Sequence, residues 1–524
     1  MKAFLLLPLG LASALSLLAQ PYDVLIRGGR VLDGTGTPWR QADVAITGDR
    51  IVEVGPIPAT ATAARVIDAR GLYVAPGFID SHSHAGEALI IKERAGVRPI
   101  VTQGVTTVFI NPDGGGPLDL PKQMSDILSA GPGVNVAPLI GHNTVRIAVL
   151  NYDNRAPSNT ELQAMQDHVR AGMQAGAYGL SSGPFYTPGN FSKTDEIVAL
   201  AKVAAEFGGV HTSHIRDESD YNIGVVASVE EVIQVSREAK LPGIVTHIKA
   251  LGPNVWGQSA EIIQRINAAR AEGLEIWADQ YPYEASSTSL AAALLPPWAQ
   301  EGGRPALLKR FENPETLADI RREMVENLKR RAGAENIQLG NYAPDPSVTG
   351  KRLGALARER LMDPVDLAID LLRRGSPGIV SYNMNETDIK AFMVQPWTMA
   401  SSDGAVAVFG EGVPHPRAYG PFARRIQKYV LAEKTLSLEQ AIHGATALPA
   451  AVLGLPDRGV LRAGAMADVI VFDLEKVRET GTYEKPHGYA EGMVEVLVNG
   501  QSVIRAGEFL DARPGRVLRK NHPE

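Results

Sequence analysis

The sequence Ala75-Pro76-Gly77-Phe78-Ile79-Asp80-Ser81-His82-Ser83-His84 predicts a short strand that ends in two histidines, two positions apart. Residues i and i+2 of a strand lie on the same face of a sheet. The imidazoles of His82 and His84 can therefore reach one metal ion. We expect this stretch to begin the main fold of the chain and to supply part of a metal site.

The chain that follows, up to about residue 454, alternates helix-like segments with short apolar strands. Residues 160–175 are an example of the former, and Ile244-Val245-Thr246 of the latter. Repeated strand and helix units favour a parallel sheet that closes on itself. We therefore predict an α/β fold with a (β/α)8 TIM-like barrel over residues 75–454. A charged, helix-rich stretch predicts an insertion at residues 296–372.

Two β-rich segments flank this central region. Residues 23–54 alternate β-rich runs with turns, and the same pattern returns after residue 467, where Asn499-Gly500 is a strong hairpin signal. The first and last elements of a barrel are neighbours, so strands that are distant in sequence can meet beside it. We predict a small β-sandwich domain built from residues 21–74 and 455–524.

Three further candidate ligands, His214, His247 and Asp403, each follow an apolar strand. The carboxyl ends of barrel strands converge at one mouth, so we expect these side chains to gather with the histidine pair described above. Imidazole nitrogen and carboxylate oxygen both suit zinc. For His211 the sequence allows two roles, facing away from His214 or helping to orient it.

The composition excludes several classes of protein. With a formal net charge of -6, the chain has no broad basic field of the kind that binds a nucleic acid backbone. The absence of cysteine excludes disulfides and thiolate ligands, so any metal must bind nitrogen and oxygen. A hydrophobic content of 44% in 524 residues is enough for at least one large core.

The first residues have the layout of a signal peptide. Met1-Lys2 precede an uncharged apolar run, residues 3–19, which contains Pro8 and Gly10. The run is shorter than the roughly 20 residues needed to span a bilayer, so we expect no stable membrane anchor. We predict a signal peptide over residues 1–20 and a secreted or periplasmic protein.

A series of ordered motifs runs through the rest of the chain. The motifs are Gly28-Gly29-Arg30-Val31-Leu32-Asp33-Gly34, Gly77–His84, Gln103-Gly104-Val105-Thr106-Thr107, Gly141-His142-Asn143, Gly179-Leu180-Ser181-Ser182-Gly183, His214-Ile215-Arg216, Tyr281-Pro282-Tyr283, Ser402-Asp403-Gly404, His415-Pro416-Arg417-Ala418-Tyr419-Gly420, Ala467-Asp468, Val498-Asn499-Gly500 and Pro514-Gly515-Arg516. Together they resemble the D-aminoacylase (N-acyl-D-amino-acid deacylase) family of the amidohydrolase superfamily. The His-x-His motif alone indicates only the superfamily, whereas Tyr-Pro-Tyr and His-Pro-Arg-Ala-Tyr-Gly are typical of this branch.

The resemblance implies zinc-dependent hydrolysis of the amide bond of N-acyl-D-amino acids, which releases a carboxylate and a free D-amino acid. It implies a metal held by His82, His84, His214 and His247. It also implies that Asp403 ligates the metal or contacts its water, and acts as general base. The chemistry agrees, because zinc lowers the pKa of bound water to about 7 and a nearby carboxylate can pass the proton to the leaving amine.

The sequence departs from this family at one position. The family carries a cysteine ligand shortly after the Gly-Val-Thr-Thr segment, where this chain has Asn111-Pro112-Asp113-Gly114. Asp113 is the natural substitute, because a carboxylate can ligate one zinc or bridge two. The alternative is an aspartate in a turn before three glycines. We predict that Asp113 is a ligand. Whether each chain binds one zinc ion or two remains open.

Cationic and phenolic side chains predict where an anionic small-molecule substrate binds. Lys249 lies two residues after His247, and Arg216 two after His214, so each cation could point into the mouth. The resemblance implies that the substrate carboxylate is held by the following residues: Lys249, Arg417, Tyr186, Tyr281 and Ser287. Arginine offers a planar fork that matches a carboxylate, and tyrosine adds an uncharged donor.

Other functions remain possible on the same scaffold. A dipeptidase that acts on a C-terminal D-residue would meet the same carboxylate and a similar amide. A cyclic-amide hydrolase of the dihydroorotase or hydantoinase type usually has a carboxylated lysine, and residues 176–183 contain no lysine. A non-catalytic relative would lack metal ligands, whereas this chain keeps them. The oligomeric state remains open.

Overall fold

The computed structural model describes residues 22–520 of the chain. The expected signal peptide at residues 1–20 lies outside the described residues. Across residues 22–520, no helix is both long enough and apolar enough to cross a membrane. Secretion stays a prediction.

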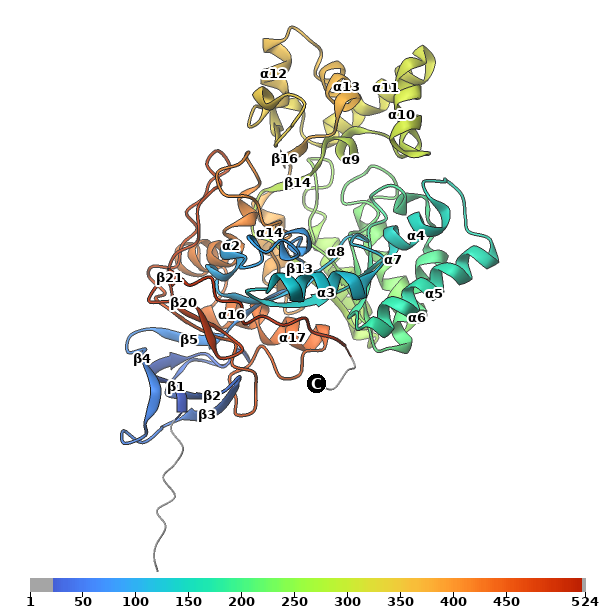
Figure 1. The fold of residues 1–524 in the computed structure, drawn as a ribbon. Coiled ribbons are helices and arrows are strands. Elements are labelled where there is room, and N and C mark those ends of the chain that lie inside the picture. The colour runs from blue at the N-terminus through green and yellow to red at the C-terminus, as the bar shows by residue number, and fades with distance from the viewer. Residues whose placement is uncertain (1–21, 521–524) are drawn as a thin grey trace, which may run out of the picture.

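Strands from both ends of the chain form one nine-stranded sheet, in the order β21-β20-β19-β18-β5-β1-β2-β3 with β4 paired to β1. The antiparallel pairing of β5 with β18 joins the N-terminal strands to the C-terminal ones. Ile46, Ile51 and Val471 share one buried cluster, so the sheet curves around a core of its own. Figure 1 shows the blue N-terminal strands beside the red C-terminal ones. The strands are β1 (Tyr22–Val31), β2 (Arg40–Thr47), β3 (Arg50–Gly55), β4 (Ala63–Asp68), β5 (Tyr73–Pro76), β18 (Val469–Phe472), β19 (Met493–Val498), β20 (Gln501–Arg505) and β21 (Glu508–Phe509).

The central region holds two sheets of parallel strands, ordered β6-β7-β8 and β17-β13-β12-β11-β10-β9. These strands are almost entirely buried, as expected of parallel strands that are covered on both faces. The strands are β6 (Phe78–Asp80), β7 (Val105–Ile110), β8 (Asn135–Pro138), β9 (Ile140–Gly141), β10 (Gly179–Ser182), β11 (Val210–Ser213), β12 (Gly243–Val245), β13 (Ile276–Gln280) and β17 (Thr398–Ala400).

Helices follow most of these strands, and Figure 1 shows α5 and α6 on the outside of the molecule. The helices of the central region are α1 (Gly86–Leu89), α2 (Arg98–Val101), α3 (Leu120–Ala130), α4 (His142–Leu150), α5 (Asn159–Ala175), α6 (Thr194–Glu206), α7 (Val225–Ala239), α8 (Ser259–Ala271), α14 (Glu386–Met393), α15 (Pro421–Arg424), α16 (Leu438–Ala445) and α17 (Ala447–Leu453).

Helix α5 shows how local sequence sets a helix on a strand. Ser158 and Glu161 form a capping box at its start, with the Glu161 side chain accepting the Ser158 N–H at 2.8 Å. Its buried side chains recur every three or four positions, which gives one apolar face. Gly172 lies on this face, where an added Cβ would come within 3.0 Å of Ile140. The helix therefore packs closely on β9.

The two parallel sheets adjoin at both edges. At one edge a single residue, Leu139, separates β8 from β9. At the other edge the backbone of Asp403 donates to His82 O at 2.9 Å, and that of His84 donates to Gly404 O at 3.0 Å. The carboxyl ends of β6 and β17 are therefore neighbours, which brings residues 82–84 next to Asp403.

A separate unit interrupts the chain between β13 and α14. Its strands form an antiparallel sheet in the order β14-β16-β15, and its helices enclose an apolar cluster of their own. Figure 1 shows it above the rest of the molecule. It extends over residues 285–382, beyond the predicted limits of 296–372. The predicted start was too late because the first strand of the unit is serine-rich and lacks an apolar pattern. Its elements are β14 (Ala285–Ser289), α9 (Leu290–Leu294), α10 (Gly303–Glu312), α11 (Pro314–Arg330), β15 (Ile337–Leu339), α12 (Leu353–Glu359), α13 (Pro364–Arg374) and β16 (Gly378–Tyr382).

The C-terminal tail returns to the central region. Val136 of β8 donates to Arg516 O and accepts from Leu518 N, both at 2.8 Å. Lys520 N donates to Gly176 O at the end of α5. The end of the predicted 455–524 segment thus leaves the β domain and lies along β8.

Candidate metal centre and its cavity

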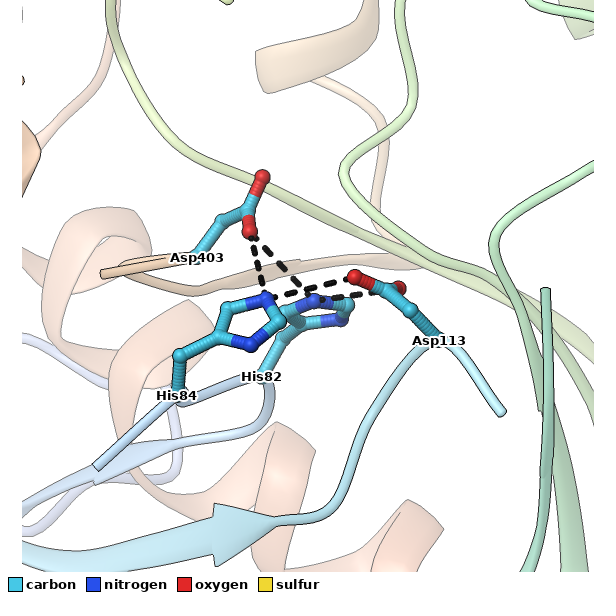
Figure 2. Close-up of side chains that lie close together, drawn as sticks. All are labelled: His82, His84, Asp113 and Asp403. Atoms are coloured by element: carbon cyan, nitrogen blue, oxygen red, sulfur yellow. Dashed lines mark hydrogen bonds and ion pairs between the residues drawn. The ribbon is translucent and has the colours of Figure 1, made fainter. Parts of the chain in front are cut away.

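Four side chains from three strand ends form the first half of the candidate metal centre. His82 and His84 follow β6. Asp113 follows β7, and Asp403 follows β17. The Nε2 of His84 lies 3.2 Å from Asp113 Oδ2 and 3.1 Å from Asp403 Oδ1, and the Nε2 of His82 lies 3.4 Å and 3.5 Å from the Oδ1 atoms of the same two aspartates. Figure 2 shows both imidazoles facing the two carboxylates across one small volume.

Asp113 also belongs to the second half of the centre, together with His214 and His247. These histidines follow β11 and β12. Asp113 Oδ1 lies 3.5 Å from His247 Nε2 and 3.8 Å from His214 Nδ1, and these two nitrogens are 2.7 Å apart. Asp113 therefore stands between the two halves, in a position from which one carboxylate can contact ligands of both.

The backbone of the centre is held in an uncommon conformation. Asp113, His247 and Asp403 are left-handed, with φ of 56°, 37° and 48°. Such residues cluster at functional sites, where the surrounding structure holds them. Gly114 makes the turn after β7 possible, because its φ is 74° and an added Cβ would lie 2.4 Å from Asn143 Oδ1. Asp113 is thus part of a tight turn and also points its carboxylate at the histidines.

Two buried carboxylates hold the ligands in place. Asp80 accepts hydrogen bonds from Ser402 N at 2.8 Å and Ser402 Oγ at 2.5 Å, so it ties the loop after β6 to the loop after β17. Burial raises the pKa of Asp80 to about 6. Asp279 of β13 accepts from His247 N at 2.9 Å, and its Oδ2 lies 4.0 Å from His82 Nδ1. Such outer partners fix the orientation of metal ligands.

The charges of the centre hold its two aspartates in the ionised form, which binds a cation. Burial raises the pKa of Asp113, but His82 outweighs this effect and holds the pKa well below its usual range. Burial opposes ionisation of Asp403 too, and the charge of Arg417 holds its pKa well below the usual range. Burial lowers the pKa of His214 to about 3, so this imidazole is neutral at neutral pH. Burial opposes protonation of the other three histidines, but nearby carboxylates outweigh it and raise the pKa of His82 and His247, and that of His84 to about 9. Zinc binds neutral imidazole, so these three histidines release a proton when they bind the metal.

The side chains present fit a zinc centre. His82 Nε2 and Asp113 Oδ1 are buried and have no hydrogen-bond partner among residues 22–520. Nearly all buried polar atoms have a partner, so such atoms indicate a bound ligand. The candidate ligand atoms form groups of four and three within 4.8 Å of one another. Nitrogen and oxygen donors in such numbers match zinc.

The centre lines a cavity of about 1050 Å³, which can enclose a small molecule. Five of the six predicted substrate-binding residues line it: Tyr186, Lys249, Tyr281, Ser287 and Arg417. Arg417 Nη1 donates to Asp403 Oδ2 at 2.7 Å. The Tyr281 hydroxyl is buried without a hydrogen-bond partner in the described part of the chain, so it is free to meet a ligand. Their role in binding stays a prediction.

Arg216, the sixth predicted residue, does not line the cavity. Its guanidinium donates to Glu231 of α7 at 2.6 Å and to Ser192 O at 2.9 Å. The prediction that it points into the mouth is wrong. Two-residue spacing from His214 gives a shared face only while a strand continues, and β11 ends at Ser213.

Sequence reasoning missed Glu218, which lies four residues after His214 in the same loop. Its Oε1 accepts from Lys249 Nζ at 2.5 Å and lies 3.1 Å from His247 Nδ1. The only signal was a second carboxylate close behind a predicted ligand. His211 faces away from the centre, because its Nε2 lies 2.8 Å from Ser182 Oγ on the neighbouring strand.

Parallel strands whose carboxyl ends carry four histidines and two aspartates around a small-molecule cavity are typical of metal-dependent enzymes with an α/β fold. The chain belongs to the amidohydrolase family, whose model matches residues 65–504.

Relatives and solved structures agree with this assignment. N-acyl-D-glutamate deacylase of Alcaligenes xylosoxydans xylosoxydans is 35% identical over 522 residues, which cover 95% of this chain and 97% of the relative. A crystal structure of N-acyl-D-glutamate deacylase from Bordetella bronchiseptica, complexed with zinc and a phosphonate inhibitor, superposes with a TM-score of 0.81 at 34% identity, covering 95% of this chain and all of that one. A structure of D-aminoacylase with a binuclear metal centre has a TM-score of 0.81 at 31% identity, and the match covers 95% of this chain and all of that one.

These findings confirm the resemblance to the D-aminoacylase family and the α/β fold class. A D-hydantoinase structure, which represents the cyclic-amide alternative, is 15% identical with a TM-score of 0.58 and shows similarity of fold alone. The comparisons therefore favour hydrolysis of linear amides over hydrolysis of cyclic amides.

Proposed function

We propose that this enzyme hydrolyses the amide bond of N-acyl-D-amino acids and releases a carboxylate and a free D-amino acid. One observation carries the proposal: a zinc-type ligand set lines the same cavity as Arg417, Lys249 and Tyr281, which can bind the carboxylate of such a substrate. The similarity to two deacylases over 95% of the chain supports it.

Zinc held by His82, His84, Asp113, His214 and His247 would supply a Lewis acid that activates water and polarises the scissile carbonyl. Asp403 accepts the proton of the attacking water at a carboxylate oxygen and returns it to the leaving nitrogen. Its Oδ1 faces His84 Nε2 at 3.1 Å, and its Oδ2 faces Arg417 at 2.7 Å. Its position between the ligands and the substrate-binding cation suits this transfer.

Arg417 and Tyr281 orient the substrate. The guanidinium of Arg417 lies 4.8 Å from the centre of the Tyr281 ring, so both groups serve one place in the cavity. A substrate carboxylate bound there competes with Asp403 for the guanidinium. Asp403 then loses part of the charge that lowers its pKa and becomes a stronger base.

Two finer structural points belong to the same proposal. The parallel strands number nine, or eight when β8 and β9 are counted as one, and their pairing continues from β17 to β6 through the bridge Ser83↔Gly404. We infer a closed (β/α)8 barrel, with the nine-stranded sheet folded beside it as a sandwich.

The location of Asp113 between two ligand groups favours two zinc ions per chain.

We also propose that the mature enzyme acts outside the cytoplasm. Support comes from the apolar run at residues 3–19. N-terminal sequencing of the protein recovered from the periplasm or medium should show a start close to residue 20 or 21. Recovery of the intact N-terminus in the cytoplasm alone would contradict this.

The function is tested by a hydrolysis screen with zinc analysis. The panel contains N-acetyl-D-amino acids, their L-enantiomers, dipeptides with a C-terminal D-residue, and a hydantoin. We expect turnover of the N-acetyl-D compounds, loss of activity on chelation, and recovery with zinc. Turnover of the dipeptides alone would replace the proposal by a dipeptidase, and turnover of the L-compounds alone would contradict its stereochemistry.

A further inference from the structure

Arg331 is the residue that follows α11 in the inserted unit. Its side chain lines the cavity although only 2% of the residue is exposed. Its Nε donates to the Tyr221 hydroxyl at 2.8 Å, and its Nη1 donates to Ser286 Oγ at 3.4 Å. Both partners are uncharged, because burial raises the pKa of Tyr221. Neither of these two hydrogen bonds pairs the Arg331 guanidinium with a carboxylate.

The other cations of the cavity wall already have carboxylate partners. Lys249 pairs with Glu218 at 2.5 Å, Arg417 with Asp403 at 2.7 Å, and Lys122 at the rim with Asp126 at 2.7 Å. Among the described residues that line this cavity, Arg331 is the cation without such a partner. Buried charges are normally paired, so an unpaired guanidinium facing a ligand cavity indicates an anionic ligand group.

Two acidic residues of the loop that contains Tyr221 have other partners. Asp217 accepts hydrogen bonds from three backbone N–H groups of its own loop, including Ser219 at 2.8 Å and Asn222 at 2.6 Å. Asp220 pairs with Arg330 at 3.2 Å. No carboxylate among residues 22–520 forms an ion pair with Arg331, so an anionic molecule in the cavity is the candidate partner.

The position of Arg331 suits binding of a substrate group that is remote from the scissile bond. Its guanidinium lies over the ring of Tyr221. The ring centres of Tyr221 and Phe185 are 5.7 Å apart, and those of Phe185 and His214 are 5.4 Å apart, so two aromatic rings link Arg331 to the nearest of these metal-ligand candidates. The carbon next to the scissile nitrogen bears the α-carboxylate, which therefore binds beside the centre, where Arg417 contacts Asp403. Arg331 and Arg417 lie along one strand, because Ser286 bonds to the first and Ser287 O accepts from Arg417 at 3.3 Å.

We propose that Arg331 binds a second carboxylate of the substrate, so that the enzyme prefers N-acyl-D-amino acids that are dicarboxylates. The inference rests on the proposed deacylase function. The second carboxylate has two chemical sources, an acidic side chain of the amino acid or the far end of a dicarboxylic acyl group. A planar guanidinium with free N–H groups is matched to either.

The test compares kcat/KM for two pairs of substrates that differ only in charge. One pair is N-acetyl-D-glutamate and N-acetyl-D-glutamine, and the other is N-succinyl-D-alanine and its succinamoyl analogue. The wild type should favour the charged member of one pair by at least about tenfold, the scale of a hydrogen bond to a charged group. The pair that shows the preference identifies the source of the carboxylate.

Arg331→Met should lose at least about tenfold more kcat/KM on the charged member than on the neutral one, and Arg331→Lys should recover part of the preference. Arg322→Met is the matched control, because Arg322 lies on α11, the helix that Arg331 follows, is exposed and pairs with Asp319. It should keep the wild-type ratio.

Equal rates of the wild type within both pairs would overturn the inference while leaving the deacylase function intact. Equal loss on charged and neutral substrates in Arg331→Met would overturn it as well. The wild-type ratios require no variant, so the test stands even if Arg331→Met fails to fold. Absence of turnover on all four compounds would overturn the proposed function and the inference together.

Discussion

Replacing Asp113 by asparagine removes a negative charge from the middle of the candidate metal centre and keeps the shape of the side chain. The backbone φ of 56° at this position is tolerated by asparagine. Alanine lacks this tolerance and costs about 1–2 kcal/mol in a left-handed conformation. We therefore expect Asp113→Ala to be about 1–2 kcal/mol less stable to urea than Asp113→Asn, because both variants lose the same charge and only alanine adds backbone strain.

The expected loss of zinc follows from the distances. Asp113 Oδ1 lies 3.4–3.8 Å from three imidazole nitrogens, and Oδ2 lies 3.2 Å from a fourth. Without this carboxylate the second half keeps only His214 and His247, one ligand fewer than the three protein ligands of a catalytic zinc site. Outer partners alone contribute about 10- to 100-fold in metal affinity. A direct ligand should contribute at least about a hundredfold.

The assay measures zinc per chain by mass spectrometry after dialysis against a series of buffered zinc concentrations. Asp113→Cys is the matched variant, because it restores a zinc ligand of a different element and should retain the metal. Unchanged zinc content and turnover in Asp113→Asn would refute the reasoning and reduce Asp113 to a turn residue.

Three further predictions concern other parts of the molecule. Asp403→Asn should keep its zinc and slow turnover by at least about a hundredfold, the scale of a positioned acid–base group, and near-normal kcat in a zinc-replete variant would exclude it from proton transfer. Arg417→Ala should lower kcat/KM for N-acetyl-D-amino acids about tenfold or more beyond its effect on the matching amides, and equal losses would exclude it as the carboxylate partner. Glu196 is buried between His142, at 2.8 Å, and Arg146; burial raises its pKa, but these partners outweigh burial and hold the pKa below its usual range. Its ionised form therefore stabilises the fold above the unfolded-state pKa of about 4.3, and this contribution is lost as the pH falls through the lower folded-state value. Urea unfolding should show Glu196→Gln less stable by about 3–5 kcal/mol at pH 7, with the difference narrowing below about pH 4, and a pH-independent difference would contradict this.

The sequence predicted those features that depend on regular periods. His82 and His84 could be paired because a strand repeats every two residues, and His214, His247 and Asp403 could be placed because parallel strands end at one edge. The structure brings all five together around Asp113. The α/β class follows from the same alternation of strand and helix.

The sequence did not predict the features that depend on loop geometry. Arg216 was misplaced because the strand period does not continue past Ser213, and Glu218 was missed because no period governs its loop. The insertion begins at Ala285 in a serine-rich strand that lacks an apolar pattern. Arg331 follows a helix some 80 residues after the Lys249 motif. Only the folded chain shows that it faces the same cavity.

The pairing of the C-terminal tail with β8 has a consequence for the order in which the chain folds. A ribosome makes the polypeptide from its N-terminus, so residues 516–520, which lie along Val136 and the end of α5, emerge after all strands of the central region. The same holds for β18, the partner of β5. Neither sheet can complete its pairing while synthesis is under way. Both sheets therefore complete their pairing only after these C-terminal residues have been made, although most of the strands are made earlier.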